Sequence, residues 1–76
     1  MRKLPVVSGR ELIRILARAG FTHARQHGSH VVLVKTDKSG KRAVVVPDHK
    51  EIDKGTLIEI IRQAGLKREE FLNLAK

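Results

Sequence analysis

The stretch that decides the fold is Arg25–Val34, which reads Arg-Gln-His-Gly-Ser-His-Val-Val-Leu-Val. A Gly-Ser pair between two extended segments predicts a tight bend, and the Val-rich run after it predicts a strand. His30 is therefore expected at the mouth of that strand, held by a sheet and reachable from solvent. An imidazole in such a position suits proton transfer at neutral pH, which makes His30 the candidate catalytic residue.

Three strands are predicted around this bend. We expect them over residues 21–27, 30–36 and 42–46, with residues 37–41 as a hairpin loop and Pro47 ending the third strand. The alternation of polar and apolar residues is weak in the first segment. Both Val-rich runs are too continuous to tell which side chains face the core.

Helices are predicted on both sides of the strands. A capping box formed by Ser8 and Glu11 starts a helix that runs to about Ala19. Asp53 is expected to cap a second helix over about residues 54–64, and residues 68–75 form a short C-terminal helix. The order α-β-β-β-α-α predicts an α+β fold like that of double-stranded RNA-binding domains. In this fold two helices pack on one face of a three-stranded antiparallel sheet and leave the other face open.

Length and composition exclude several classes of protein. The 76 residues are expected to form one domain over residues 1–76, with a small core and no enclosed cofactor cavity. Without cysteine there are no disulfides and no thiolate metal sites, which suits a cytoplasmic protein. The start Met1-Arg2-Lys3 is basic, but Pro5 and Gly9 interrupt the residues after it, so we expect no signal peptide. No apolar run approaches the ~20 residues of a membrane helix.

The charge is strongly positive and unevenly distributed. The net charge is +8, and residues 1–46 hold ten Lys and Arg against two acids, whereas residues 47–76 hold six of each sign. Arg10, Arg14 and Arg18 form a row four residues apart on one helix face. Such a surface indicates a polyanionic partner, most often nucleic acid, although a row of this kind can also be a solvated helix face. The chain has only two aromatic residues, which disfavours recognition of single strands by base stacking.

Five segments of the chain, taken together and in order, resemble the HicA-type mRNA interferases, the toxins of HicA–HicB toxin–antitoxin pairs. They are Leu4–Ile13, Gly20-Phe21, Arg25–His30, Val46–His49 and Lys54–Gly65. The resemblance implies a fold like the double-stranded RNA-binding domain, cleavage of mRNA centred on His30, and neutralisation by a cognate HicB antitoxin. Many relatives carry a further His or an aromatic residue directly after that histidine, where this chain has Val31.

Four further residues are predicted to bind RNA near His30. Arg25 and Lys35 are candidates for stabilising the phosphate, because neighbouring strands could bring them close to the imidazole. Gly28 and Ser29 shape the bend, and the Ser29 hydroxyl or amide could hold a phosphate oxygen. The arginine row of the first helix completes the predicted RNA-binding surface. His30 is expected to act as general acid or general base, with the order of these roles open.

The other histidines are interpreted as surface or structural residues. His27 is interpreted as a solvent-exposed strand residue rather than a second proton carrier, and His49 as part of a connector. His23, His27 and His30 have spacings that on a helix would suit zinc, but their segment lacks helical periodicity. We therefore expect no metal and no cofactor, and RNA products that carry 2′,3′-cyclic phosphate ends.

Two alternatives to a toxin endoribonuclease remain open. One is a non-catalytic RNA-binding module of the same fold, which would bind RNA in a salt-dependent way without cleaving it. The other is an interaction protein whose basic surface serves only a protein partner.

Overall fold

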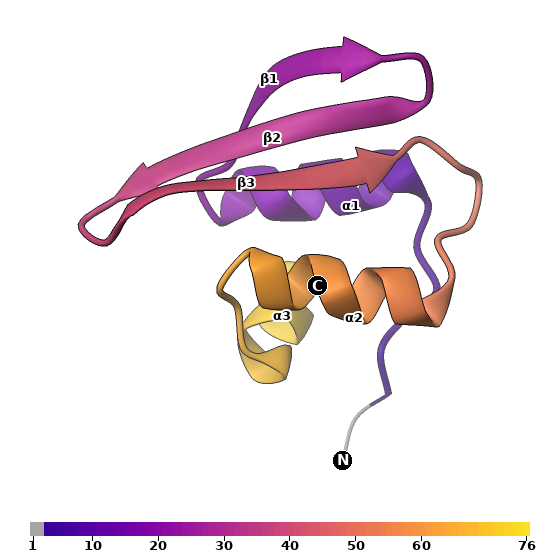
Figure 1. The fold of residues 1–76 in the computed structure, drawn as a ribbon. Coiled ribbons are helices and arrows are strands. Elements are labelled where there is room, and N and C mark those ends of the chain that lie inside the picture. Colours follow the sequence, from indigo (N-terminus) through magenta and orange to yellow (C-terminus); the bar gives the residue numbers. More distant parts are fainter. Residues whose placement is uncertain (1–2) are drawn as a thin grey trace.

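The computed structural model describes residues 3–76 and has the predicted order of elements (Figure 1). Met1 and Arg2 of the basic N-terminal run lie outside the described residues. The fold is α+β and of the double-stranded RNA-binding-domain type, as predicted. Its elements are α1 (Gly9–Arg18), β1 (Thr22–His27), β2 (His30–Asp37), β3 (Gly40–Pro47), α2 (Lys54–Gln63) and α3 (Arg68–Leu74).

Local hydrogen bonds begin the two longer helices where the sequence predicts them. At α1 the Glu11 amide donates to the Ser8 hydroxyl over 3.1 Å, and the Ser8 amide donates to the Glu11 carboxylate over 2.9 Å. At α2 the Asp53 carboxylate accepts from the Thr56 amide over 3.0 Å. Each cap satisfies backbone groups that have no partner within the helix. The hydrogen bonds from Ser8 hold the pKa of Glu11 below its usual value.

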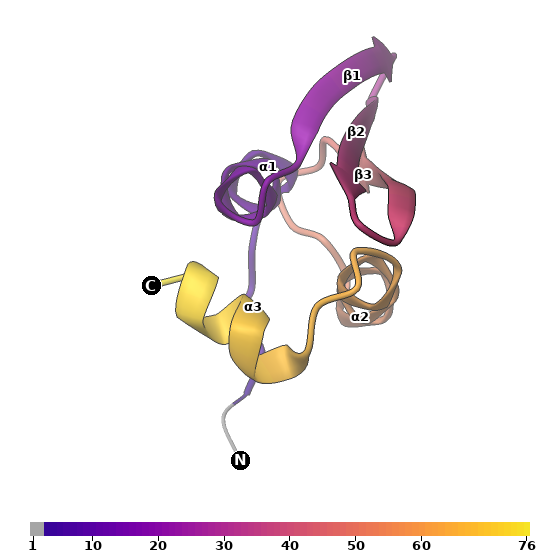
Figure 2. The same cartoon turned by 90° about the vertical axis from the view of Figure 1, so that its left-hand side faces the viewer.

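The sheet has the order β1-β2-β3 with both pairs antiparallel, and the helices lie on one side of it (Figure 2). Val31 and Leu33 of β2 are buried, and they pair with Val46 and Val44 of β3, which are buried as well. These side chains face the helices. The alternate residues lie on the opposite side, which we call the open face, and there Val45 is 47% exposed.

A β-bulge at Ala24 divides β1 into two parts that present opposite faces. Near the turn Arg25 pairs with Val32, whereas beyond the bulge His23 pairs with Leu33. Thr22 pairs with Val34, and continuing this register by one residue places Phe21 opposite Lys35, on the helix-facing side. A single extra residue reverses which side chains point inward. The bulge therefore lets Phe21 enter the core while Arg25 stays on the open face, which explains the weak alternation of this segment.

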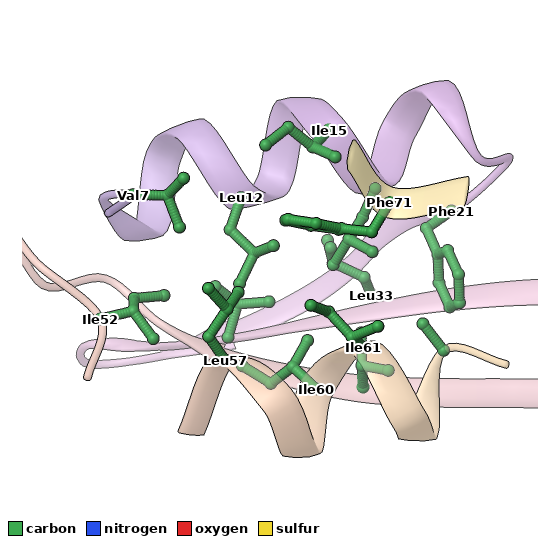
Figure 3. Packing of buried hydrophobic residues seen from close by; sticks show 14 of the residues in the cluster. Val7, Leu12, Ile15, Phe21, Leu33, Ile52, Leu57, Ile60, Ile61 and Phe71 are labelled. Carbon is green, nitrogen blue, oxygen red and sulfur yellow. The ribbon is translucent and has the colours of Figure 1, made fainter. Parts of the chain in front are cut away.

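The core lies between the sheet and the three helices, and Figure 3 shows its packing. Leu12 of α1, Leu33 of β2 and Leu57 of α2 meet there, and Phe71 of α3 is fully buried among them. The short third helix is therefore an integral part of the core. None of the helices in residues 3–76 has both the length and the apolar character needed to cross a membrane.

Candidate active site

The turn between β1 and β2 has two residues, Gly28 and Ser29, and His27 pairs directly with His30 across it. Gly28 has a φ of 58°, and a glycine in the left-handed region at the first central position is typical of a type II′ hairpin turn. The Gln26 side-chain amide donates to the Gly28 carbonyl over 2.9 Å. The Asp48 amide donates to the Ser29 carbonyl over 2.6 Å. The turn is thus hydrogen-bonded both to β1 and to the connector that follows β3.

His30 is exposed at the first residue of β2, as the sequence predicts. It lies between His27 on β1 and Pro47 on β3. Since the next residue, Val31, is buried against the helices, the His30 side chain belongs to the open face. The imidazole is therefore fixed at its backbone and open to a ligand on the sheet surface.

Arg25 lies on the same face as His27 and His30. It pairs with Val32, two residues beyond His30, so it is a diagonal neighbour of His30 across the two strands. Residues in such a diagonal arrangement are roughly 7–8 Å apart, within reach of a long side chain. We call Arg25, His27 and His30 the open-face cluster. It combines two imidazoles with a guanidinium, whose planar geometry suits a phosphate.

Lys35 lies elsewhere, and the expectation that it approaches His30 is wrong. Lys35 is five positions after His30 along β2, which corresponds to roughly 16 Å at the rise of an extended strand. The odd spacing also directs Lys35 to the helix-facing side. Its ammonium nitrogen lies 5.8 Å from the ring centroid of Phe21. The side chain thus covers the edge of the core at the far end of the sheet.

The arginine row of α1 has three different environments. Arg10 is close to Asp48, with 3.8 Å between Nε and Oδ1, and its side chain is 82% exposed. Arg14 is exposed on the next turn. Arg18 donates through Nη1 to the carbonyl oxygens of Leu74 and Lys76 over 2.7 and 2.9 Å. Arg18 therefore joins α1 to the end of α3, and Arg10 is the member of the row nearest to the Ser29 turn.

A shallow hollow of about 300 Å³ adjoins the turn through Asp48. Its lining comes from the start of α1 and the β3–α2 connector, namely Ser8, Arg10, Asp48, His49 and Lys50. The His49 carbonyl accepts from the Gly9 amide over 2.8 Å, which fixes the connector against the helix. The backbone of His49 thus has the structural role expected from the sequence. Its side chain, however, is exposed beside Arg10.

The three histidines near the bend do not share one face. His27 and His30 lie on the open face, whereas His23, beyond the bulge, pairs with the buried Leu33. Within residues 3–76 there is no group of three or more His, Asp or Glu side chains that could hold a metal ion together.

These features define a class: a small basic α+β domain with the fold of double-stranded RNA-binding domains and an exposed histidine on its open sheet face. Residues 9–66 match the family described as the HicA toxin of bacterial toxin–antitoxin systems. The chain belongs to this family of toxins. The matched span contains the open-face cluster and the connector with His49, whereas α3 lies beyond it. No curated protein shows significant similarity to the chain.

Proposed function

We propose that this toxin is a metal-independent endoribonuclease that cleaves mRNA with His30 as a general acid or base. The observation that carries the proposal is the exposure of His30 on the open face, at a hairpin turn fixed by hydrogen bonds, within the span that matches the toxin family. The surrounding positive charge supports RNA as the substrate.

RNA carries its own nucleophile, so the protein has few tasks to perform. The 2′-hydroxyl loses a proton and attacks the adjacent phosphorus, and the bond from phosphorus to the 5′-oxygen breaks. The departing 5′-oxygen takes up a proton. His30 performs one of these transfers, because an imidazole ordinarily titrates close to neutral pH. Arg25 stabilises the charge on the phosphate oxygens. The products carry a 2′,3′-cyclic phosphate and a 5′-hydroxyl.

The RNA passes from the open-face cluster around the Gly28–Ser29 turn to α1, which lies on the helix-facing side of the sheet. Gly28 and Ser29 contact the phosphate at the turn, Arg10 and Arg14 contact phosphates further along α1, and Lys35 and Arg18 make at most peripheral contacts. We also propose that an acidic antitoxin of the HicB type neutralises the toxin by covering this surface. The excess of Lys and Arg in residues 1–46 supports an acidic partner.

The decisive experiment incubates purified wild type, His30→Ala and His23→Ala with RNA in EDTA. His23→Ala is the matched control, since it removes an exposed histidine from the other face of the same hairpin. We expect cleavage by wild type and His23→Ala, cyclic phosphate ends on the products, and no cleavage by His30→Ala. Expression of the wild type should arrest growth, and His30→Ala should relieve the arrest.

Two outcomes would contradict the proposal. Loss of cleavage in EDTA with recovery on adding zinc would show a metal-dependent reaction. Salt-dependent RNA binding without cleavage, unchanged in His30→Ala, would show a non-catalytic RNA-binding module.

A further inference from the structure

His27 and His30 are directly opposite each other on the open face, separated in the sequence only by the two-residue turn. Both are exposed. Cβ atoms of directly opposed residues in an antiparallel pair are about 4.5–5.5 Å apart, so the two rings can contact the same phosphodiester. His27 owes this position to the register of the hairpin, which the Gly28–Ser29 turn sets.

Three interactions fix the backbone of the hairpin that carries the two imidazoles. The Gln26 amide binds the Gly28 carbonyl, the Asp48 amide binds the Ser29 carbonyl, and His30 is paired to β3 through Pro47. A pair of groups that must act on two atoms of one substrate requires such fixed spacing.

The charged groups around the pair are few. On β1 the open-face neighbour is Arg25, and on β3 the residue opposite His30 is the uncharged Pro47. The Asp48 carboxylate, next in the chain, lies 3.8 Å from Arg10. In the described part of the chain, neither imidazole forms an ion pair with a carboxylate. The pair therefore faces the solvent with a guanidinium beside it, an arrangement that suits an anionic substrate.

We propose that His27 and His30 work as an acid–base pair in RNA cleavage. This inference rests on the proposed function and adds a second catalytic residue to it. One imidazole accepts the proton of the 2′-hydroxyl as the oxygen–phosphorus bond forms. The other imidazole, protonated beforehand, donates its proton to the 5′-oxygen as the phosphorus–oxygen bond breaks. After each turnover the two rings exchange protons with water and return to their starting states.

Near neutral pH the two tasks require one neutral and one protonated imidazole at the same time. Histidine is the side chain whose ordinary titration range allows both forms to be populated there. The rate of cleavage by wild type should therefore follow a bell-shaped dependence on pH. In a variant that lacks either histidine, the cleavage rate should no longer fall on one side of its pH optimum.

The test compares two RNA substrates that differ only at the scissile bond. In the second substrate sulfur replaces the bridging 5′-oxygen, so that the leaving thiolate departs without a proton. The proteins are wild type, His27→Gln, His30→Gln and the control His23→Gln, with circular dichroism spectra and melting temperatures measured for each.

On the ordinary substrate we expect both His27→Gln and His30→Gln to be about 10²–10⁴-fold slower than wild type. On the sulfur substrate one of the two variants, which has lost the general acid, should recover to near the wild-type rate. The other, which has lost the general base, should stay slow. His23→Gln should match wild type on both substrates.

The outcomes that overturn this inference differ from those that overturn the proposed function. If His27→Gln cleaves the ordinary substrate like wild type while His30→Gln is inactive, His27 has no catalytic role and the nuclease proposal stands. If both variants are slow and neither recovers on the sulfur substrate, the pair does not divide the proton transfers. If neither substitution affects cleavage, the histidine mechanism itself fails.

Discussion

Gly9 and Pro47 approach so closely that no side chain fits between them. A Cβ atom on Gly9 would overlap the Pro47 carbonyl oxygen and lie 2.8 Å from the Cα atom of Asp48. The start of α1 therefore packs directly against the end of β3, at Pro47, which is the strand residue that pairs with His30. Both obstructing groups are backbone, so neither can rotate away.

The first prediction concerns this contact. Gly9→Ala should lower the free energy of unfolding by about 1–3 kcal/mol, the usual cost of overpacking. The control is Gly55→Ala in α2, where the nearest atom to a new Cβ is a side-chain oxygen of Asp53 at 3.4 Å. Urea denaturation measures the free energy of unfolding of both variants. Equal stability of Gly9→Ala and wild type would show that the helix and the strand can separate at this point.

The second prediction concerns the bulge at Ala24. Deleting Ala24 removes the extra residue and closes the bulge, so that Arg25 still pairs with Val32, His23 still pairs with Leu33, and Phe21 keeps its place in the core. Expulsion of Phe21 from the core would cost about 1.5–3 kcal/mol in unfolding free energy, and the deletion should cost less than this. Ala24→Ser keeps the number of residues and should change stability by less than about 0.5 kcal/mol. A deletion variant destabilised by about 1.5–3 kcal/mol would mean that Phe21 leaves the core and that Ala24 is not the extra residue of the strand.

The third prediction tests the role of α3 in the core. Phe71 is fully buried, so Phe71→Ala should reduce the unfolding free energy by about 3–5 kcal/mol. Asn73→Ala, on the exposed side of the same helix, should be nearly neutral. Thermal and urea denaturation should give the same loss of unfolding free energy for Phe71→Ala. If Phe71→Ala unfolds at the wild-type urea concentration, α3 is dispensable for stability.

The fourth prediction concerns the phosphate contact proposed for Arg25. In a His30→Ala background, which prevents cleavage, RNA affinity is measured by fluorescence anisotropy over a range of salt concentrations. Arg25→Ala should reduce the slope of log affinity against log salt by about 0.7–0.9, the value for one lost phosphate contact. Arg62→Ala is the control, because Arg62 is on α2 and pairs with Glu59. An unchanged slope in Arg25→Ala would remove this residue from the site.

The fifth prediction concerns acid stability. The hydrogen bonds from Thr56 hold the pKa of Asp53 below its ordinary value of 3.8. A carboxyl with a lowered folded-state pKa stabilises the protein above the unfolded-state value, and this contribution is lost as the pH falls through the folded-state value. Asn also caps helices but does not titrate. The stability of wild type relative to Asp53→Asn should therefore decrease as the pH falls from neutral to below 3.8. A difference in stability between wild type and Asp53→Asn that stays constant with pH would contradict this prediction.

Much of the fold is predictable because its signals are local. The Ser8 and Asp53 caps and the Gly-Ser turn act over a few neighbouring residues, and each is found where the sequence indicates. The exposure of His30 depends on the same local signals. The placement of Lys35 is not predictable in this way, because its position depends on strand length and on the face it occupies.

The sequence by itself determined the order of elements, the helix starts, the hairpin around Gly28 and the excess of positive charge, since these depend on near neighbours or on composition. Only the tertiary structure decided which valines face the helices and that a bulge at Ala24 separates His23 from the other two histidines. The physical reason is that the side chains of a strand alternate between two faces, so one extra residue reverses them, and only packing against the helices selects which side chains face the core.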